Sequence, residues 1–81
     1  MNTIHSSEIK DLSLAAYLYA TGQVKLTGTK RLSHNEVIFL FSPDESVQML
    51  LRQYWNLQAP IIQPKQLFSA LRDVKDIIFS G

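Results

Sequence analysis

Cysteine is absent from this chain of 81 residues, and histidine occurs only twice, as His5 and His34. Disulfide bonds are therefore excluded, and a structural metal site, which usually takes Cys and His ligands, is not expected. The lack of cysteine is compatible with a cytosolic protein but does not require one. Glycine and proline occur three times each and mark turns and the ends of helices. The sequence shows no low-complexity tract, internal repeat or linker.

Strong charge and long apolar runs are also lacking. The net charge is +1, whereas a strongly basic nucleic-acid binder would usually carry more. The longest apolar stretches, 14–20 and 37–41, fall far short of the ~20 residues that span a bilayer. The first residues show neither the basic nor the apolar region of a signal peptide. We therefore expect a cytoplasmic protein that binds no membrane.

The length of the chain allows one domain. We expect residues 1–10 to be weakly ordered and residues 11–81 to form a single small domain. A chain of this size buries only about 60–65% of its unfolded surface, so its stability is marginal without an additional device. With disulfides and metals set aside, oligomerisation is the remaining device, and a hydrophobic content of 46% supplies the surface for it.

The first helix is predicted over residues 12–20. Asp11 before it can accept hydrogen bonds from the free N–H groups of the first turn, and Gly22 after it suits a left-handed helix end. The segment is apolar on every side, and a helix of that kind is buried on every side. In so small a domain, this suggests that a second chain covers part of the helix.

Two strands follow, over residues 24–32 and 36–41, and the turn at 33–35 joins them into an antiparallel hairpin. In the first strand the alternation leaves one face wet and partly cationic, and Gly28 inside it indicates a bulge or a close backbone approach. The second strand is apolar on both faces. We expect something besides the local helices to cover Ile38 and Leu40.

Two more helices complete the pattern. Ser42 is predicted to cap the first of them, with Pro43 at its first position and Glu45 completing a capping box. That helix ends by about residue 59, before a proline. Pro64 opens the last helix, which runs to about Phe79 and has an apolar arc of roughly 200°, wider than that of an ordinary surface helix. The predicted fold class is α+β in the order α-β-β-α-α: one antiparallel β-hairpin packed with three helices and completed by dimerisation.

Three passages of the chain carry a combined motif: D-L-S-L-A-A-Y-L at 11–18, Y-W-N at 54–56, and P-K-Q-L-F-S-A-L-R-D-V-K-D-I-I-F at 64–79. In these motifs the chain resembles a family of short, uncharacterised prokaryotic and phage-associated proteins, a domain of unknown function, over residues 9–79. It departs from the family pattern at Gln63, where aspartate is usual, and at Lys10, where Thr or Ser is expected. Because the motifs consist mostly of packing residues, the resemblance implies the fold and no activity.

No group of residues points to catalysis. Asp73 and Asp76 can approach each other on the last helix, but a solvated face explains them because no third metal ligand is nearby. His34 lies in the hairpin turn without a histidine or cysteine partner, and neither Gly22 nor Gly28 precedes a helix as a phosphate loop requires. We therefore predict no catalytic, cofactor-binding or metal site, and a protein that is not an enzyme.

Three cationic residues of the hairpin, Lys25, Lys30 and Arg31, provide the main alternative. A basic β-ribbon can lie on a phosphate backbone, so these residues are candidate nucleic-acid contacts. The same residues can equally form a solvated sheet face whose lysines protect its edge. That face lacks the aromatic side chains on which a single-strand binder stacks bases.

Apolar residues outside the predicted core are the candidates for assembly. Trp55, at the rim of its helix stripe, is a candidate partner anchor, although it can also complete the core or a self-interface. The candidate self-interface consists of Ile38, Leu40, Phe68 and Phe79. The favoured interpretation is a non-enzymatic binding or accessory module that forms a homodimer, commonly through a twofold interface. The alternative is a nucleic-acid-binding regulator that uses the basic hairpin.

Overall fold

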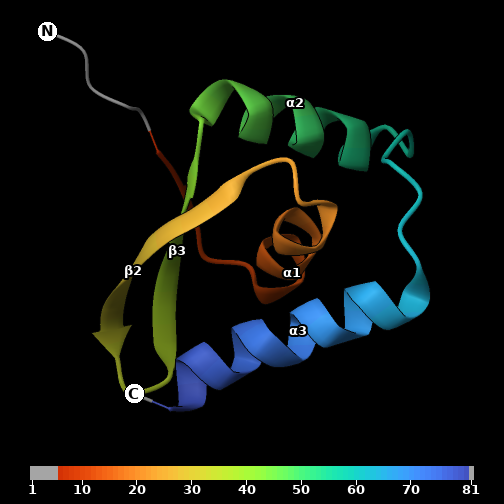
Figure 1. The fold of residues 1–81 in the computed structure, drawn as a ribbon. Coiled ribbons are helices and arrows are strands. Elements are labelled where there is room, and N and C mark those ends of the chain that lie inside the picture. The colour runs from red at the N-terminus through yellow and green to blue at the C-terminus, as the bar shows by residue number, and fades with distance from the viewer. Residues whose placement is uncertain (1–5, 81) are drawn as a thin grey trace, which may run out of the picture.

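Three helices and a three-stranded antiparallel sheet make up residues 6–80, the part of the chain that this computed structural model describes (Figure 1). The elements in chain order are β1 (Ser7–Ile9), α1 (Leu12–Thr21), β2 (Lys25–Ser33), β3 (Glu36–Ser42), α2 (Asp44–Trp55) and α3 (Pro64–Phe79). The α+β class and the order helix, hairpin, helix, helix are confirmed, and the sheet has one strand more than predicted. No helix within residues 6–80 is long and apolar enough to cross a membrane.

Helix α1 lies at the centre, with the sheet on one side and α2 and α3 on two others (Figure 1). Its start is as predicted, because the Asp11 side chain accepts a hydrogen bond from the N–H of Leu14 over 3.1 Å. Its end is also as predicted, since Gly22 has a left-handed φ of 69°. The residues that α1 buries are Ala15, Ala16, Tyr17, Leu18 and Ala20. Contrary to expectation, the chain itself supplies the surroundings of α1, so this helix does not require a second copy.

Strand β3 is the middle strand of the sheet, whose order is β1-β3-β2. Its alternation is as predicted: Val37, Phe39 and Phe41 are buried, and Ile38 and Leu40 are half-buried on the other face. All three helices lie on one side of the sheet (Figure 1). The face that carries Ile38 and Leu40, which we name the open face, therefore has none of these helices over it.

Residues 1–10 are predicted to be weakly ordered, but strand β1 (Ser7–Ile9), which the sequence analysis missed, lies within this segment; residues 1–5 of it lie outside the described part. Ser7–Ile9 pairs antiparallel with residues 39–41 of β3. The Ser7 side chain is buried, and its hydroxyl donates a hydrogen bond to the Asp44 carboxylate at the start of α2. Three residues, S-E-I, are too few for a two-residue period to be recognised, so only the pairing with β3 reveals the strand.

Gly28 marks a β-bulge, one of the two possibilities that the sequence leaves open at this position. The pairing of β2 with β3 shifts register just before Gly28 and again near the end of β2. The first shift reverses the alternation of β2, because cross-strand partners share a face of the sheet. Lys30 then lies opposite Ile38 on the open face, and Arg31 lies opposite Val37 on the side of the helices.

Helix α2 begins one residue later than the predicted capping box requires. Ser42 is still paired with Lys25 as the last residue of β3, and the N-cap position is held by Pro43, which makes no side-chain hydrogen bond. The first helical hydrogen bond runs from the N–H of Val47 to the carbonyl of Pro43 over 3.1 Å. The prediction that Ser42 caps this helix is therefore wrong, because the sheet holds that residue. The start of α2 is instead tied to β1 through Asp44.

Helices α2 and α3 turn their predicted apolar sides to the core. Val47 and Leu50 of α2 are completely buried. Helix α3 has the predicted bounds, with Pro64 in its first turn, and it buries Ala70 and Val74. Partly buried side chains pack around these residues: Leu51, Tyr54, Leu67, Leu71, Ile77 and Ile78. The two helices therefore close the core from two sides and leave the linker 56–63 on the surface between them.

Removal of single hydroxyl groups tests which serine stabilises the start of α2. We expect Ser7→Ala to lower the free energy of unfolding by about 1–2 kcal/mol, because a buried hydroxyl that donates to a carboxylate is lost. Ser42→Ala should change it by less than about 0.5 kcal/mol, because that hydroxyl caps no helix. Urea denaturation followed by circular dichroism measures both changes. A loss of about 1 kcal/mol in Ser42→Ala alone would reinstate the capping box.

Candidate functional site

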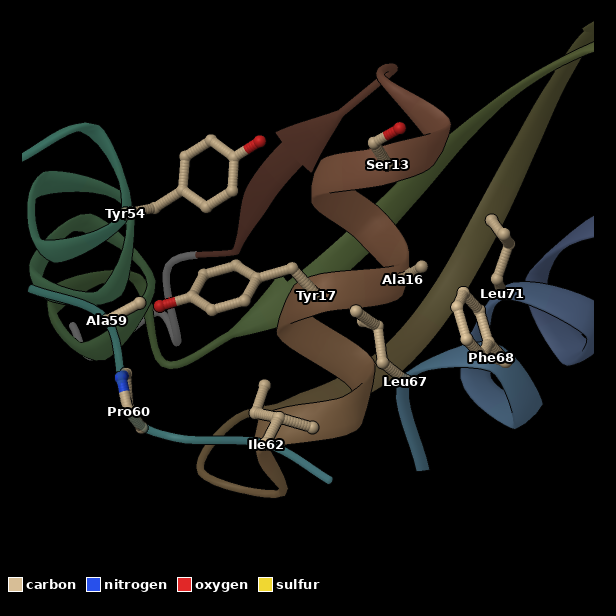
Figure 2. A pocket seen from close by; sticks show the side chains of 10 residues that line it. All are labelled: Ser13, Ala16, Tyr17, Tyr54, Ala59, Pro60, Ile62, Leu67, Phe68 and Leu71. Atoms are coloured by element: carbon tan, nitrogen blue, oxygen red, sulfur yellow. The ribbon is translucent and has the colours of Figure 1, made fainter. Parts of the chain in front are cut away.

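An apolar groove runs beside α1, between the linker and α3 (Figure 2). Its volume is about 400 Å³. The lining residues are Ser13, Ala16 and Tyr17 of α1, Tyr54 of α2, Ala59, Pro60 and Ile62 of the linker, and Leu67, Phe68 and Leu71 of α3. Only Ser13 and the two tyrosines among them carry a side-chain polar atom. A groove of this size and lining suits apolar groups rather than charged ones.

Tyr17 lies along the groove and is fixed in place by its polar and aromatic contacts (Figure 2). Its hydroxyl donates a hydrogen bond to the backbone carbonyl of Leu50 in α2 over 3.1 Å. Its ring centroid lies 5.1 Å from that of Tyr54, which in turn meets Trp55 edge-on at 5.2 Å. Burial, with a smaller contribution from Tyr54, raises the pKa of Tyr17 above its ordinary value. Its hydroxyl is therefore a neutral structural donor at physiological pH.

Three exposed apolar side chains at the end of α2 and in the linker, Trp55, Leu57 and Ile61, form what we name the linker patch. Their exposed fractions are 69%, 94% and 98%, so they contribute little to the core. A hollow beside Trp55 and Leu57 shares Tyr54 and Ala59 with the groove, so these two residues of the patch adjoin the groove. Ile61 lies in the linker between Pro60 and Ile62, two lining residues of the groove. Leu57 also has a φ of 59°, which is unfavourable for a residue with a Cβ.

A second exposed feature, named the α3 stripe, consists of Lys65, Phe68, Arg72, Lys75 and Phe79. At about 100° per residue, these positions fall within an arc of roughly 80°, separate from the buried side of the helix. Phe68 and Phe79 are 63% and 71% exposed. A hollow of about 410 Å³ extends along this surface and has Leu71 in its lining. Two residues of the predicted self-interface are therefore exposed on α3.

The three cations of the predicted nucleic-acid surface do not form one cluster. Lys25 and Lys30 have register positions on the open face, whereas Arg31 lies on the side of the helices. The Nζ atom of Lys30 lies 3.0 Å from a carboxylate oxygen of Glu8. Lys25 forms no ion pair within residues 6–80. The bulge at Gly28 thus separates Lys25 from Arg31, which strict alternation would place on one face, and brings Lys30 to the face of Lys25.

The guanidinium of Arg31 is bound to backbone carbonyls. Nη2 donates to Ile77 and Ile78 at the end of α3 over 3.1 and 2.9 Å. Nη1 donates to Ser33 and His34 in the hairpin turn over 3.2 and 2.9 Å. Helix C-termini leave carbonyls without helical partners, and the helix dipole favours a cation there. Arg31 therefore joins the hairpin to α3 as a structural clamp.

Charged side chains on the open face of the sheet partly cover the apolar residues of the same face. Register places Glu8 beside Leu40 and Lys30 beside Ile38, so the ion pair between the two charged side chains crosses this face. A second pair joins Lys10 to Glu36 over 3.8 Å. Long charged side chains can cover apolar surface with their stems. Ile38 and Leu40 are accordingly half-buried, and they lie on a different surface from the two phenylalanines of α3.

Titratable groups are scattered across the described residues. Residues 6–80 hold no group of three or more His, Cys, Asp or Glu side chains that could bind a metal ion. His34 is exposed in the hairpin turn, and the exposed side chains of Asp73 and Asp76 border different hollows. Of the predicted self-interface, Phe68 and Phe79 line one hollow on α3, and Ile38 and Leu40 share the open face. The exposed apolar side chains on α3 can bind apolar surface.

Sequence reasoning singled out Trp55, Phe68 and Phe79 but missed Leu57 and Ile61. A signal was present for Ile61, which lies outside any helical or strand period in a segment that prolines keep extended. Leu57 instead continues the spacing of Leu50 and Tyr54 in a helix predicted to run to about residue 59, whereas α2 ends at Trp55. A large apolar residue without a periodic pattern has no predictable place in the core, and the structure leaves both almost fully exposed.

The fold and these surfaces define a small α+β module that presents apolar surface and a cationic helix stripe. The chain belongs to the family described as Domain of unknown function (DUF5659), whose model matches residues 5–80. The resemblance seen in the motifs is thereby confirmed. No curated protein and no solved structure matches the chain.

The pKa of Tyr17 predicts how stability responds to alkaline pH. The pKa of Tyr17 in the folded protein is raised above the ordinary value of 10.0. The contribution of the neutral Tyr17 hydroxyl to the free energy of unfolding is therefore complete below about pH 10 and is lost as pH rises through the folded pKa. We expect Tyr17→Phe to be about 1 kcal/mol less stable than wild type at pH 8, through loss of the bond to Leu50. The gap should narrow at higher pH in urea melts. A gap that stays constant up to pH 11 would contradict the shift.

Replacing single cations of β2 tests the clamp. Arg31→Gln should lower the free energy of unfolding by about 1–2 kcal/mol, because charge-assisted bonds to four carbonyls are lost. Lys25→Gln, the matched control on the same strand, should change it by less than about 0.5 kcal/mol. Hydrogen exchange should show faster opening of the last turn of α3 in Arg31→Gln only. Equal effects of the two variants would mean that the clamp contributes nothing specific.

Proposed function

We propose that this protein is a non-enzymatic accessory module, acting in the cytoplasm as a homodimer, and that the linker patch and the adjoining groove form the dimer interface. The observation that carries the proposal is the linker patch, whose large apolar side chains are almost fully exposed. An exposed apolar patch beside a hollow is typical of protein–protein contacts. The lack of cysteine suits the reducing cytoplasm.

The side chain of Leu57 adds to the exposed apolar surface of the patch. Its left-handed backbone is unfavourable by about 1–2 kcal/mol for a residue with a Cβ. Hydrogen bonds at the end of α2 accompany this conformation, from the N–H of Leu57 to the Tyr54 carbonyl over 3.2 Å and from the N–H of Gln58 to the Gln53 carbonyl over 2.7 Å. The conformation therefore ends the helix and needs no partner. The side chain is 94% exposed, and packing against a second copy would bury it.

The size of the surface also fits a dimer. A stable interface typically buries ~800 Å² on each partner, and a large apolar or aromatic side chain contributes up to roughly 150–250 Å². The linker patch, together with the groove walls formed by α1 and the linker, is of that order. In a twofold arrangement the patch of each copy lies against the groove of the other, and a groove of about 400 Å³ has room for a large apolar side chain.

Nucleic-acid binding by the hairpin has less support. Lys30 is paired with Glu8, and Arg31 is bound to backbone carbonyls of the turn and of α3. A phosphate would have to displace these partners before either cation could contact it. The geometry therefore favours an assembly role over a basic ribbon that lies on phosphates.

Matched substitutions test the interface. Sedimentation at micromolar concentration should give twice the chain mass for wild type and the single chain mass for Ile61→Glu, because a charge would then be buried in the contact. Ile61 is 98% exposed, so the monomer fold is not disturbed. Met49→Glu is the matched control, since Met49 is also exposed and lines a different hollow. A folded wild-type monomer, or equal loss in both variants, would refute the interface.

Leu57→Asn separates binding from stability in the same chain. Asparagine tolerates the left-handed conformation better than leucine. We therefore expect the free energy of unfolding of the monomer to rise by up to ~1 kcal/mol while the dimer weakens by about tenfold or more. Dilution series in the ultracentrifuge and urea melts measure the two quantities. A dimer of unchanged affinity would remove Leu57 from the interface.

A further inference from the structure

The α3 stripe carries positive side chains that the proposed dimer interface does not pair with carboxylates. Lys65, Arg72 and Lys75 are exposed, and the ion pairs within residues 6–80, Lys10–Glu36 and Lys30–Glu8, include none of them. Asp76 follows Arg72 by one helical turn but forms no ion pair with it in that part of the chain. The stripe is therefore a local excess of positive charge on a chain whose net charge is only +1.

The two exposed phenylalanines of the stripe line an apolar hollow. Phe68 and Phe79 are eleven positions apart, which corresponds to ~16 Å along a helix. The hollow that both residues line has Leu71, Arg72 and Lys75 in its lining as well. An apolar centre bordered by guanidinium and ammonium groups is complementary to an apolar side chain flanked by carboxylates.

A second copy of the chain does not suit this surface. In a twofold contact the same patch meets itself, so the positive stripes of both copies would face each other. Like charges placed opposite one another disfavour association. The stripe is thereby distinguished from the linker patch, which carries no charged residue and is free to meet its own copy.

We propose that the α3 stripe binds an acidic amphipathic segment of another protein. An apolar side chain of that segment enters the hollow between Phe68 and Phe79, and its flanking carboxylates pair with Arg72 and Lys75. This binding goes beyond the proposed homodimer and does not depend on it. The protein would then link its partner to a second copy of itself.

Two other anionic partners fit the surface less well. An anionic bilayer surface presents its negative headgroups to the Asp76 carboxylate of the hollow as well as to the cations. A phosphate backbone presents only negative groups, and the hollow also contains the carboxylate of Asp76. The carboxylates of a peptide helix can pair with the cations, and the free N–H groups of its first turn can donate to Asp76.

Fluorescence anisotropy with a labelled synthetic peptide tests the proposal. The probe is a helical peptide of Glu and Leu with leucines on one face, and a scrambled peptide of the same composition is its control. We expect micromolar binding of the amphipathic peptide and about tenfold weaker binding of the scrambled one. Phe79→Ser and the double variant Arg72→Gln, Lys75→Gln should each weaken binding about tenfold. Lys25→Gln should leave it unchanged.

The altered side chains are exposed, so the variants should keep the wild-type circular dichroism. Measurements on both wild type and Ile61→Glu keep this result separate from the dimer, because peptide binding should be equal in the two. Absence of peptide binding, or equal binding of the scrambled peptide, would overturn the proposal. Tighter binding of oligothymidine would favour a nucleic-acid partner instead, and tighter binding of vesicles with phosphatidylglycerol would favour a lipid surface.

Discussion

The enclosure of α1 is the interaction on which the rest of the structure depends. Its many alanines allow the sheet, α2 and α3 to approach closely, and Leu18 in their midst is completely buried. Directed hydrogen bonds fix the two outer helices against it. Tyr17 donates to the Leu50 carbonyl of α2 over 3.1 Å, and Gln66 of α3 donates to the Ala20 carbonyl at the end of α1 over 2.6 Å. Because both helices are fixed to α1, the ends of the linker between them are fixed as well.

The same constraint shapes the surfaces that we assign to binding. Helix α3 is held near its start by Gln66 and at its end by Arg31, which bonds two of its last carbonyls. Phe68, Arg72 and Lys75 of the stripe lie between these anchors, and Phe79 directly follows the second one. A surface that is held at both ends is preorganised, and a partner loses less conformational freedom in binding it. The hydrogen bonds that join α3 to α1 and to β2 thus fix the geometry of the α3 stripe, although all residues of the stripe belong to α3.

The sequence predicts the elements that depend on local signals and misses those that depend on distant pairing. Gly22 and Pro64 mark helix ends through their own backbone preferences, and the structure places both as predicted. Ser42 carries a helix-start signature, yet pairing with β2 holds it in the sheet. The bulge at Gly28 was one of two possibilities, and its register shift decides which hairpin cations share a face. The conformation of Leu57 has no local sequence signal, so this part of the site needs the structure.

The reason for expecting assembly changes once the structure is known. Apolar surplus in α1 first suggested a second chain, but its own chain encloses that helix, and Ile38 and Leu40 are half-covered on the open face. Within residues 6–80, the most exposed large apolar side chains lie in the linker patch and the α3 stripe, and Tyr19, Leu32 and Met49 are exposed to 40–51%. In the linker patch, a side chain such as Ile61 is 98% exposed and contributes little to folding. Buried side-chain N and O atoms in residues 6–80 all have hydrogen-bond partners, and these exposed residues supply none of them. The exposed side chains of the proposed binding surfaces therefore differ from those that form the core, and each set can be altered separately.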